Sequence, residues 1–284
     1  MKKYFSILII AVVSTFMISC RENKPITQDL SASIANSDGD FHTTLSSGLS
    51  IDSYELEGPP GMEPLTFNPV SDYLQEELLS IHQEDRSQGF PDNSFFDMMT
   101  FGRRAEFGKG EIIAIERSSI PENPEPESMA SMQIDVKIDD EILYSASAGD
   151  MIILPPLKGL WTYNQSWALE YAMGTMTLDK SANTATSTAI GQLVVDGVLI
   201  NERDSFDEIF GFQLMHEKPF YFFEKDGQIG ISYDDEVIML GYEEIPHYAC
   251  CSPAMLNPRH TQNMVSFFAM KNDTWYYVEV GVYQ

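Results

Sequence analysis

The chain has 284 residues, of which 43% are apolar and 12% aromatic, and its 43 acidic against 17 basic residues give a net charge of −26. This length and composition allow a large core, in one domain or two. A surface this negative repels phosphates, which excludes nucleic acid as an expected partner, and it suits divalent cations, cationic ligands or simple solubility. Three cysteines are too few for a fold held together by disulfides.

The first twenty residues have the layout of an export signal. Lys2 and Lys3 precede sixteen uncharged, mostly apolar residues at 4–19, and Cys20 follows them. A basic start, a short apolar run and a small residue before the cut are typical of secretion signals. A permanent membrane span needs about twenty apolar residues, which favours a cleaved signal over an anchor.

With Cys20 directly after the cut, residues 1 to about 24 resemble bacterial lipoproteins. The resemblance implies export, a diacylglycerol on Cys20 and tethering to the cell envelope, and Arg21 in place of Asp implies onward transport to the outer membrane. Met17 stands where such signals usually carry Leu, so a soluble secreted product and an uncleaved anchor stay open as alternatives. Residues 1–19 are therefore the expected signal peptide.

Residues 20–50 are rich in Ser, Thr, Asn, Asp and Gly and show no helical or strand periodicity. This composition predicts a lipidated flexible tether. Within it, residues 36–40 resemble part of a calcium loop but lack the bidentate Glu, which favours a simple turn.

Residues 51–130 are expected to form a mixed segment with one helix and one short strand. Ser71 can cap a helix over residues 72–82, in which apolar residues share one face. The β-branched run at 111–116 predicts a strand.

Residues 131–284 predict an antiparallel β domain. Apolar alternating runs flank short polar pairs, and the flanked Asp-Gly pair is a strong hairpin signal, because type I′ turns need positive φ at both central residues. The turn pairs are Asp139-Asp140, Asn164-Gln165, Asp196-Gly197, Asp226-Gly227, Asp234-Asp235 and Asn272-Asp273. The expected fold is mainly β, a hairpin-rich sandwich or propeller-like domain with a small helix-containing N-terminal segment. This part resembles uncharacterised β-rich exported proteins, which implies no activity.

One loop gathers soft metal donors. His247, Cys250 and Cys251 lie close together in the sequence, and His260 follows nine residues later. Imidazole and thiolate are suitable ligands for zinc or copper, although the spacing matches neither Cys-x-x-Cys pairs nor a His-x3-His helix face. The alternatives are a vicinal disulfide, favoured by an oxidising compartment, and two reduced buried thiols beside a core histidine.

Trp161, Tyr163 and Trp167 surround one turn and are candidates for stacking on a ligand such as a sugar, with core packing as the alternative. The chain has no Gly-x-Ser-x-Gly nucleophile elbow and no complete zinc-protease motif. The many acidic residues allow no carboxylate pair to be assigned to an extracellular hydrolase.

The sequence thus predicts a membrane-tethered, exported lipoprotein with a ligand-binding, partner-binding or structural role, and it favours a non-enzymatic one. The first alternative is a metal- or redox-active protein that uses the loop of His247, Cys250, Cys251 and His260. The second is a hydrolase with unassigned carboxylates.

Overall fold

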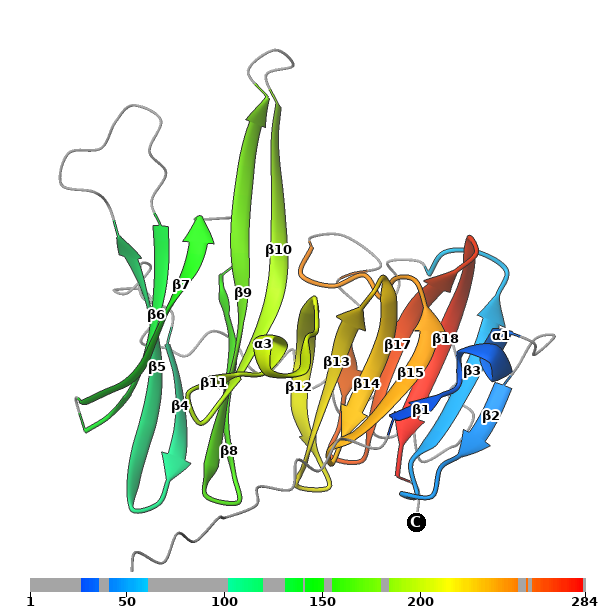
Figure 1. Ribbon diagram of the computed structural model, residues 1–284, viewed down its shortest axis with the longest axis horizontal. Coiled ribbons are helices and arrows are strands. Elements are labelled where there is room, and N and C mark those ends of the chain that lie inside the picture. The colour runs from blue at the N-terminus through cyan, green and yellow to red at the C-terminus, as the bar shows by residue number, and fades with distance from the viewer. Residues whose placement is uncertain are drawn as a thin grey trace, which may run out of the picture.

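The computed structural model describes residues 27–35, 41–60, 102–119, 131–139, 141–150, 155–179, 184–249, 254 and 257–282. Strands dominate these residues, which confirms the predicted mainly β class (Figure 1). The helices there, α1 (Ser31–Ala35) and α3 (Ile200–Asp204), have five residues each. Within the same ranges, no helix is long and apolar enough to cross a bilayer.

The first half of the described fold is an eight-stranded sheet. Its order is β11-β10-β9-β7-β6-β5-β4, and β8 also pairs with β9, on the side away from β10. The strands are β4 (Gly102–Phe107), β5 (Gly110–Ser119), β6 (Ser131–Ile138), β7 (Glu141–Asp150), β8 (Leu157–Tyr163), β9 (Ser166–Asp179), β10 (Thr184–Val195) and β11 (Val198–Leu199). The sheet curls so that β8 contacts β4, and it encloses a core that includes Ile134, Trp167 and Leu169.

Two five-stranded sheets form the other half. The first has the order β1-β15-β14-β13-β12 and the second β16-β17-β18-β3-β2. The strands of the first are β1 (Thr27–Asp29), β12 (Glu208–Met215), β13 (Lys218–Lys225), β14 (Gln228–Tyr233) and β15 (Glu236–Tyr242). Those of the second are β2 (Phe41–Thr44), β3 (Ser50–Leu56), β16 (Arg259–His260), β17 (Met264–Lys271) and β18 (Thr274–Gly281).

These two sheets stack as a sandwich, because alternate residues of each send apolar side chains into one shared core. Phe222 of β13 lies edge-on to Phe267 of β17 across this core, with ring centroids 4.9 Å apart. The other face of the first sheet packs against the eight-stranded sheet, where Phe212 and Phe223 meet Ala168 and Leu193.

The predicted hairpins are all present, and their turns have the predicted backbone. Both central residues have positive φ in Asn164-Gln165, Asp196-Gly197, Asp226-Gly227, Asp234-Asp235 and Asn272-Asp273. Asp139 also has positive φ, and Asp140 lies outside the described residues. The predicted strand at 111–116 lies within β5.

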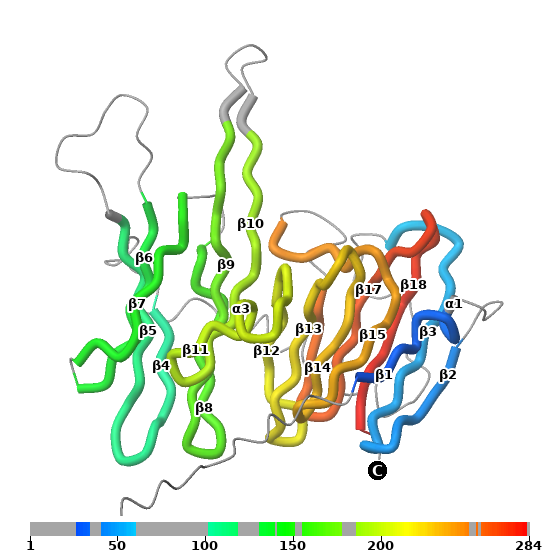
Figure 2. The backbone as a smooth tube through the Cα atoms, viewed as in Figure 1, coloured from blue at the N-terminus to red at the C-terminus, as the bar shows by residue number. Residues whose placement is uncertain are grey.

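The expected tether differs from the structure. Residues 27–29, 31–35 and 41–44 form β1, α1 and β2 in place of a flexible chain. A three-residue strand carries no readable periodicity, and β1 exists because it pairs in parallel with β15, where Thr27 lies opposite Val237. Figure 2 shows β1 and α1 beside β15, and β2 at the outer edge of the other sheet, next to β3.

The expected boundary between a mixed segment at 51–130 and a β domain at 131–284 does not separate the sheets, because strands from both sides of it pair with each other. β5 pairs with β6 in one sheet, and β3 pairs with β18 along its whole length. The predicted helix at 72–82 and the turn at 36–40 lie outside the described residues, as do the signal peptide and Cys20.

Candidate functional site

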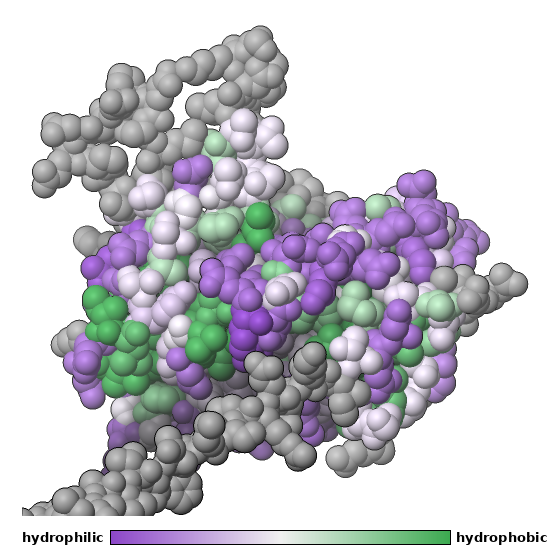
Figure 3. Space-filling view, in the orientation of Figure 1, coloured by the Kyte–Doolittle hydropathy of each residue, from purple (hydrophilic) through white to green (hydrophobic). Residues whose placement is uncertain are grey.

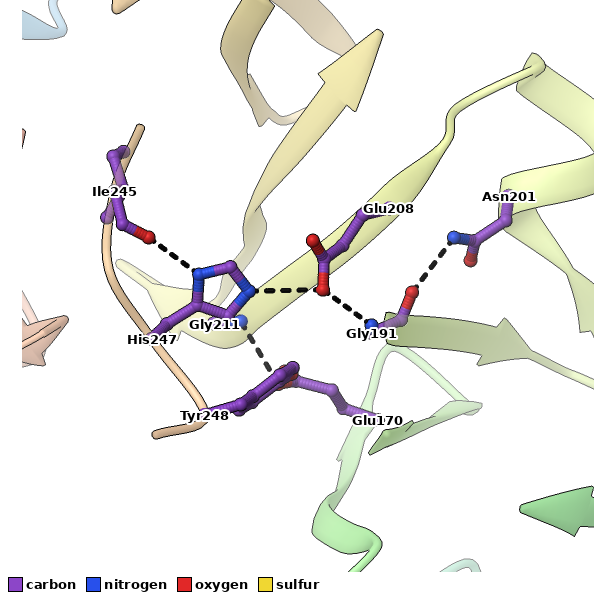
Figure 4. A network of polar contacts seen from close by, with 8 residues as sticks. All are labelled: Glu170, Gly191, Asn201, Glu208, Gly211, Ile245, His247 and Tyr248. Atoms are coloured by element: carbon purple, nitrogen blue, oxygen red, sulfur yellow. Dashed lines mark hydrogen bonds and ion pairs between the residues drawn. The ribbon is translucent and has the colours of Figure 1, made fainter. Parts of the chain in front are cut away.

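The most concentrated polar chemistry in the described chain lies where the eight-stranded sheet meets the sandwich (Figure 4). We call Glu170, Glu208, His247 and Tyr248 the junction network. Glu170 belongs to β9 and Glu208 to β12, while His247 and Tyr248 belong to the segment that follows β15. The network therefore joins three separate parts of the chain.

Glu170 is the centre of the network and is only 2% exposed. Its carboxylate accepts hydrogen bonds from the N–H groups of Gly211 (3.0 Å) and Phe212 and from the hydroxyl of Tyr248. These N–H groups are available because the pairing of β12 with β13 shifts register between Phe210 and Gln213. A bulge of this kind removes residues from the ladder, and Gly211 accommodates it with a φ of 66°.

Burial sets the protonation of this pair. Desolvation raises the pKa of Glu170 above its ordinary value, and the hydrogen bonds from Tyr248 and the two N–H groups oppose that rise. Desolvation and the carboxylate of Glu170 together hold the pKa of Tyr248 well above its usual range. Tyr248 is therefore a fixed hydrogen-bond donor at neutral pH and not a proton acceptor.

Glu208 and His247 form the second half of the network. The carboxylate of Glu208 accepts from the N–H of Gly191 at 2.7 Å and lies 3.1 Å from Nε2 of His247. Nδ1 of His247 lies 2.6 Å from the carbonyl of Ile245, which can only accept, so Nδ1 carries a hydrogen. The 3.1 Å contact between Nε2 and Glu208 links this segment to β12.

The ring of His247 lies flat on Phe210, with centroids 3.5 Å apart and planes inclined by 8°. Both of its nitrogens and one of its faces are therefore already in contact with the protein. A metal ion could bind His247 only if the ring gave up Ile245 or Glu208.

Lys158 of β8 lies on the other side of Tyr248. Its Nζ is 4.5 Å from the centroid of the Tyr248 ring and donates to the carbonyl of Pro155 at 2.8 Å. Desolvation lowers the pKa of Lys158, and the charges of Glu170 and Glu116 oppose the change. Glu116 of β5 is fully buried and accepts from the N–H of Leu157, and its own burial raises its pKa.

The residues predicted as a metal or redox loop are only partly described. His247 is in the junction network, His260 belongs to β16 of the second five-stranded sheet, and Cys250 and Cys251 lie outside the described residues. Among the residues that the structure does describe, no three His, Cys, Asp or Glu side chains are grouped as metal ligands.

The predicted stacking residues do not form one platform. Trp167 is 5% exposed in the core of the curled sheet, where it lies against Tyr144. Trp161 and Tyr163 instead pack against Phe212, at centroid distances of 4.9 and 6.1 Å. These contacts agree with the alternative of core packing.

Sequence reasoning missed Glu116, Glu170 and Glu208. Glu116 stands beside Arg117, so the sequence reads it as the polar end of a strand. A signal existed for Glu170, because it is a single acid between the apolar residues Leu169 and Tyr171 of a strand. Such an acid must be buried with partners or must lie on a solvent face. The sequence could not supply the partners of Glu170, which are backbone groups exposed by a bulge in another sheet.

No protein-family model matches the chain, and no curated protein matches it at a significant level. Function must therefore be argued from the residues themselves.

Proposed function

We propose that the protein is an exported lipoprotein, attached through Cys20 to the cell envelope, and specifically to the outer membrane. The observation that carries this proposal is the sequence of Lys2, Lys3, an apolar run at 4–19 and a cysteine directly after it. Cleavage would remove two of the basic residues and no acidic one, so the mature chain would be still more negative.

The position of β1 refines how such a tether would work. Thr27 is the first residue that the structure describes, and it lies seven residues after Cys20. A fully extended chain of seven residues spans at most about 25 Å. The β domain would therefore stay close to the membrane surface, unlike a domain on a linker of thirty residues.

For the β domain we propose a binding or structural role in the envelope without catalysis. This part is supported by the junction network, in which the buried acids, His247 and Tyr248 are bonded to one another and to backbone groups. An acid, base or nucleophile has to reach a substrate, whereas these groups hold β9, β10 and β12 together.

The lipid attachment is tested by feeding bacteria that express the full chain with an alkyne-tagged fatty acid. The wild type and a Cys250→Ala control should both carry the label and fractionate with outer membranes. Cys20→Ala should lose the label. A labelled Cys20→Ala protein would show that the lipid is elsewhere and that the proposal is wrong.

The alternative of a metal- or redox-active loop is tested in two ways. Metal analysis of protein purified without chelators detects a bound ion, and intact mass before and after reduction detects a disulfide. We expect no bound zinc or copper. One equivalent of either metal, lost in His247→Gln and kept in a control such as His42→Gln, would overturn this part and favour a metal site.

A further inference from the structure

The outer half of the β9–β10 hairpin extends beyond the rest of its sheet (Figure 1). β8 pairs with β9 no further than Tyr171, β7 meets β9 only at Gly174, and β11 reaches β10 only at Val194 and Val195. Over residues 184–190, the described chain offers β10 no strand partner other than β9. Among the strands of the described ranges, this stretch of β10 is therefore an open sheet edge.

The directions of the free backbone groups follow from the pairing. In antiparallel pairs, alternate residues direct their N–H and C=O groups toward the partner or away from it. The N–H groups of Gly191 and Leu193 donate away from β9, to Glu208 (2.7 Å) and Asn201 (3.0 Å). The same alternation turns the backbone groups of residues 185, 187 and 189 outward.

This edge also lacks the usual protection against pairing. Natural edge strands carry lysine, proline or bulges that prevent contact with other strands. Residues 171–178 and 184–195 contain no charged residue, in a chain that is 21% charged. Figure 3 shows the described part of the projecting hairpin mostly in pale colours, whereas purple atoms form a broad band across the upper part of the sandwich.

The charge pattern favours a second copy of this chain as the occupant. Two molecules that each carry a charge of −26 repel one another over most of their surfaces. The neutral hairpin projects from the body, so two copies that meet through it keep their charged bodies apart.

The sequence of the edge is itself nearly symmetric about Ser187. Residues 184–190 read Thr-Ala-Thr-Ser-Thr-Ala-Ile. If a two-fold axis passed through Ser187, Thr186 would lie opposite Thr188 of the second copy, and residue 185 opposite residue 189. The outward groups of 185, 187 and 189 would then form three hydrogen-bonded pairs, and Thr–Thr pairs across strands are favourable.

We propose that the protein self-associates through antiparallel pairing of β10 with β10 of a second copy, centred on Ser187. The contact is isologous, since the same strand serves both sides. It is short, so a dissociation constant on the order of 10 µM is expected.

The test is sedimentation equilibrium of the full chain in a density-matched detergent, at concentrations on both sides of that value. The wild type should reach twice the chain mass. Ser187→Lys places two ammonium groups opposite each other and should weaken association by about fivefold. Both Ser187 and the control position, Thr177 of β9, are exposed, so neither lysine should disturb folding.

Thr177→Lys adds the same charge to the same hairpin but to the strand outside the interface. The two lysines would be about three strand spacings apart, or ~14 Å, which exceeds the ~8 Å Debye length at physiological ionic strength. This variant should dimerise like the wild type. A wild type that stays monomeric throughout overturns the proposal, as does a Ser187→Lys protein that associates as tightly as Thr177→Lys.

A cysteine pair gives an independent test. Hydrogen-bonded residues across an antiparallel pair have Cα atoms about 5.5 Å apart, within the range of a disulfide. Ser187→Cys should form a covalent dimer in oxidised glutathione. The two thiols are oxidised to a disulfide, and the glutathione disulfide is reduced to two thiols. Thr177→Cys should behave like the wild type, and equal cross-linking at both positions would contradict pairing centred on Ser187.

Discussion

Replacing Glu170 by alanine removes the acceptor of three donors at once. The N–H groups of Gly211 and Phe212 are fixed by the bulge in β12, and the hydroxyl of Tyr248 donates to the same carboxylate. Each buried donor left without an acceptor costs about 1–3 kcal/mol, so the two N–H groups together cost about 2–6 kcal/mol. Removing a desolvated carboxylate, whose pKa is raised by burial, offsets part of this cost. We expect Glu170→Ala to lower the free energy of unfolding by about 3 kcal/mol.

The assay is urea unfolding at neutral pH, followed by tryptophan fluorescence, since Trp161 and Trp167 lie close to this region. Glu170→Gln keeps one acceptor oxygen and should lie between the wild type and Glu170→Ala. Glu202→Ala is the matched control, because Glu202 is an exposed acid of α3, and it should stay within about 0.5 kcal/mol of the wild type. If Glu170→Ala and Glu202→Ala unfolded at the same urea concentration, the carboxylate would not be holding the bulge and the reasoning would be refuted.

Two further predictions concern stability. Burial, together with the charge of Asp52, raises the pKa of Glu279 from 4.5 to about 7. Between these pH values the folded protein keeps a proton on Glu279 that the unfolded chain releases. The free energy of unfolding therefore falls as the pH rises from 4.5 through 7. The free energy of unfolding of Glu279→Gln should therefore equal that of the wild type near pH 4 and exceed it by up to about 3 kcal/mol at pH 8. A difference in urea midpoints that did not grow with pH would contradict this. A Cβ at Gly191 would lie 2.0 Å from the carbonyl oxygen of Ile209, so Gly191→Ala should separate β10 from β12 and lower the free energy of unfolding by about 3 kcal/mol. Gly102→Ala, where the nearest atom is 3.5 Å away, is the control and should unfold like the wild type in the same assay.

The β content could be predicted because its signals are local. A turn such as Asp226-Gly227 needs positive φ at neighbouring residues, and the apolar runs on both sides indicate the pairing of β13 with β14. The same holds for Asn272-Asp273 between β17 and β18.

What could not be predicted depends on partners that are distant in the sequence. β1 has three residues and is stabilised by β15, which lies more than two hundred residues later. Glu170 and Gly211 likewise meet only because a bulge in one sheet faces a strand of another. His247 was identified as a site residue from its type, but its partners Glu208 and Ile245 follow only from the fold.

The pairing of β3 with β18 has a consequence for the order of folding. Ile51 lies opposite Val280, so this pairing forms only when β18 is available. In a chain that emerges N-terminus first, β2 and β3 have no β18 to pair with until residues 274–281 have emerged, whereas the hairpins between β12 and β15 can form earlier. We expect the sandwich to be the slow step of folding and a C-terminal truncation before β18 to expose the edge of β3.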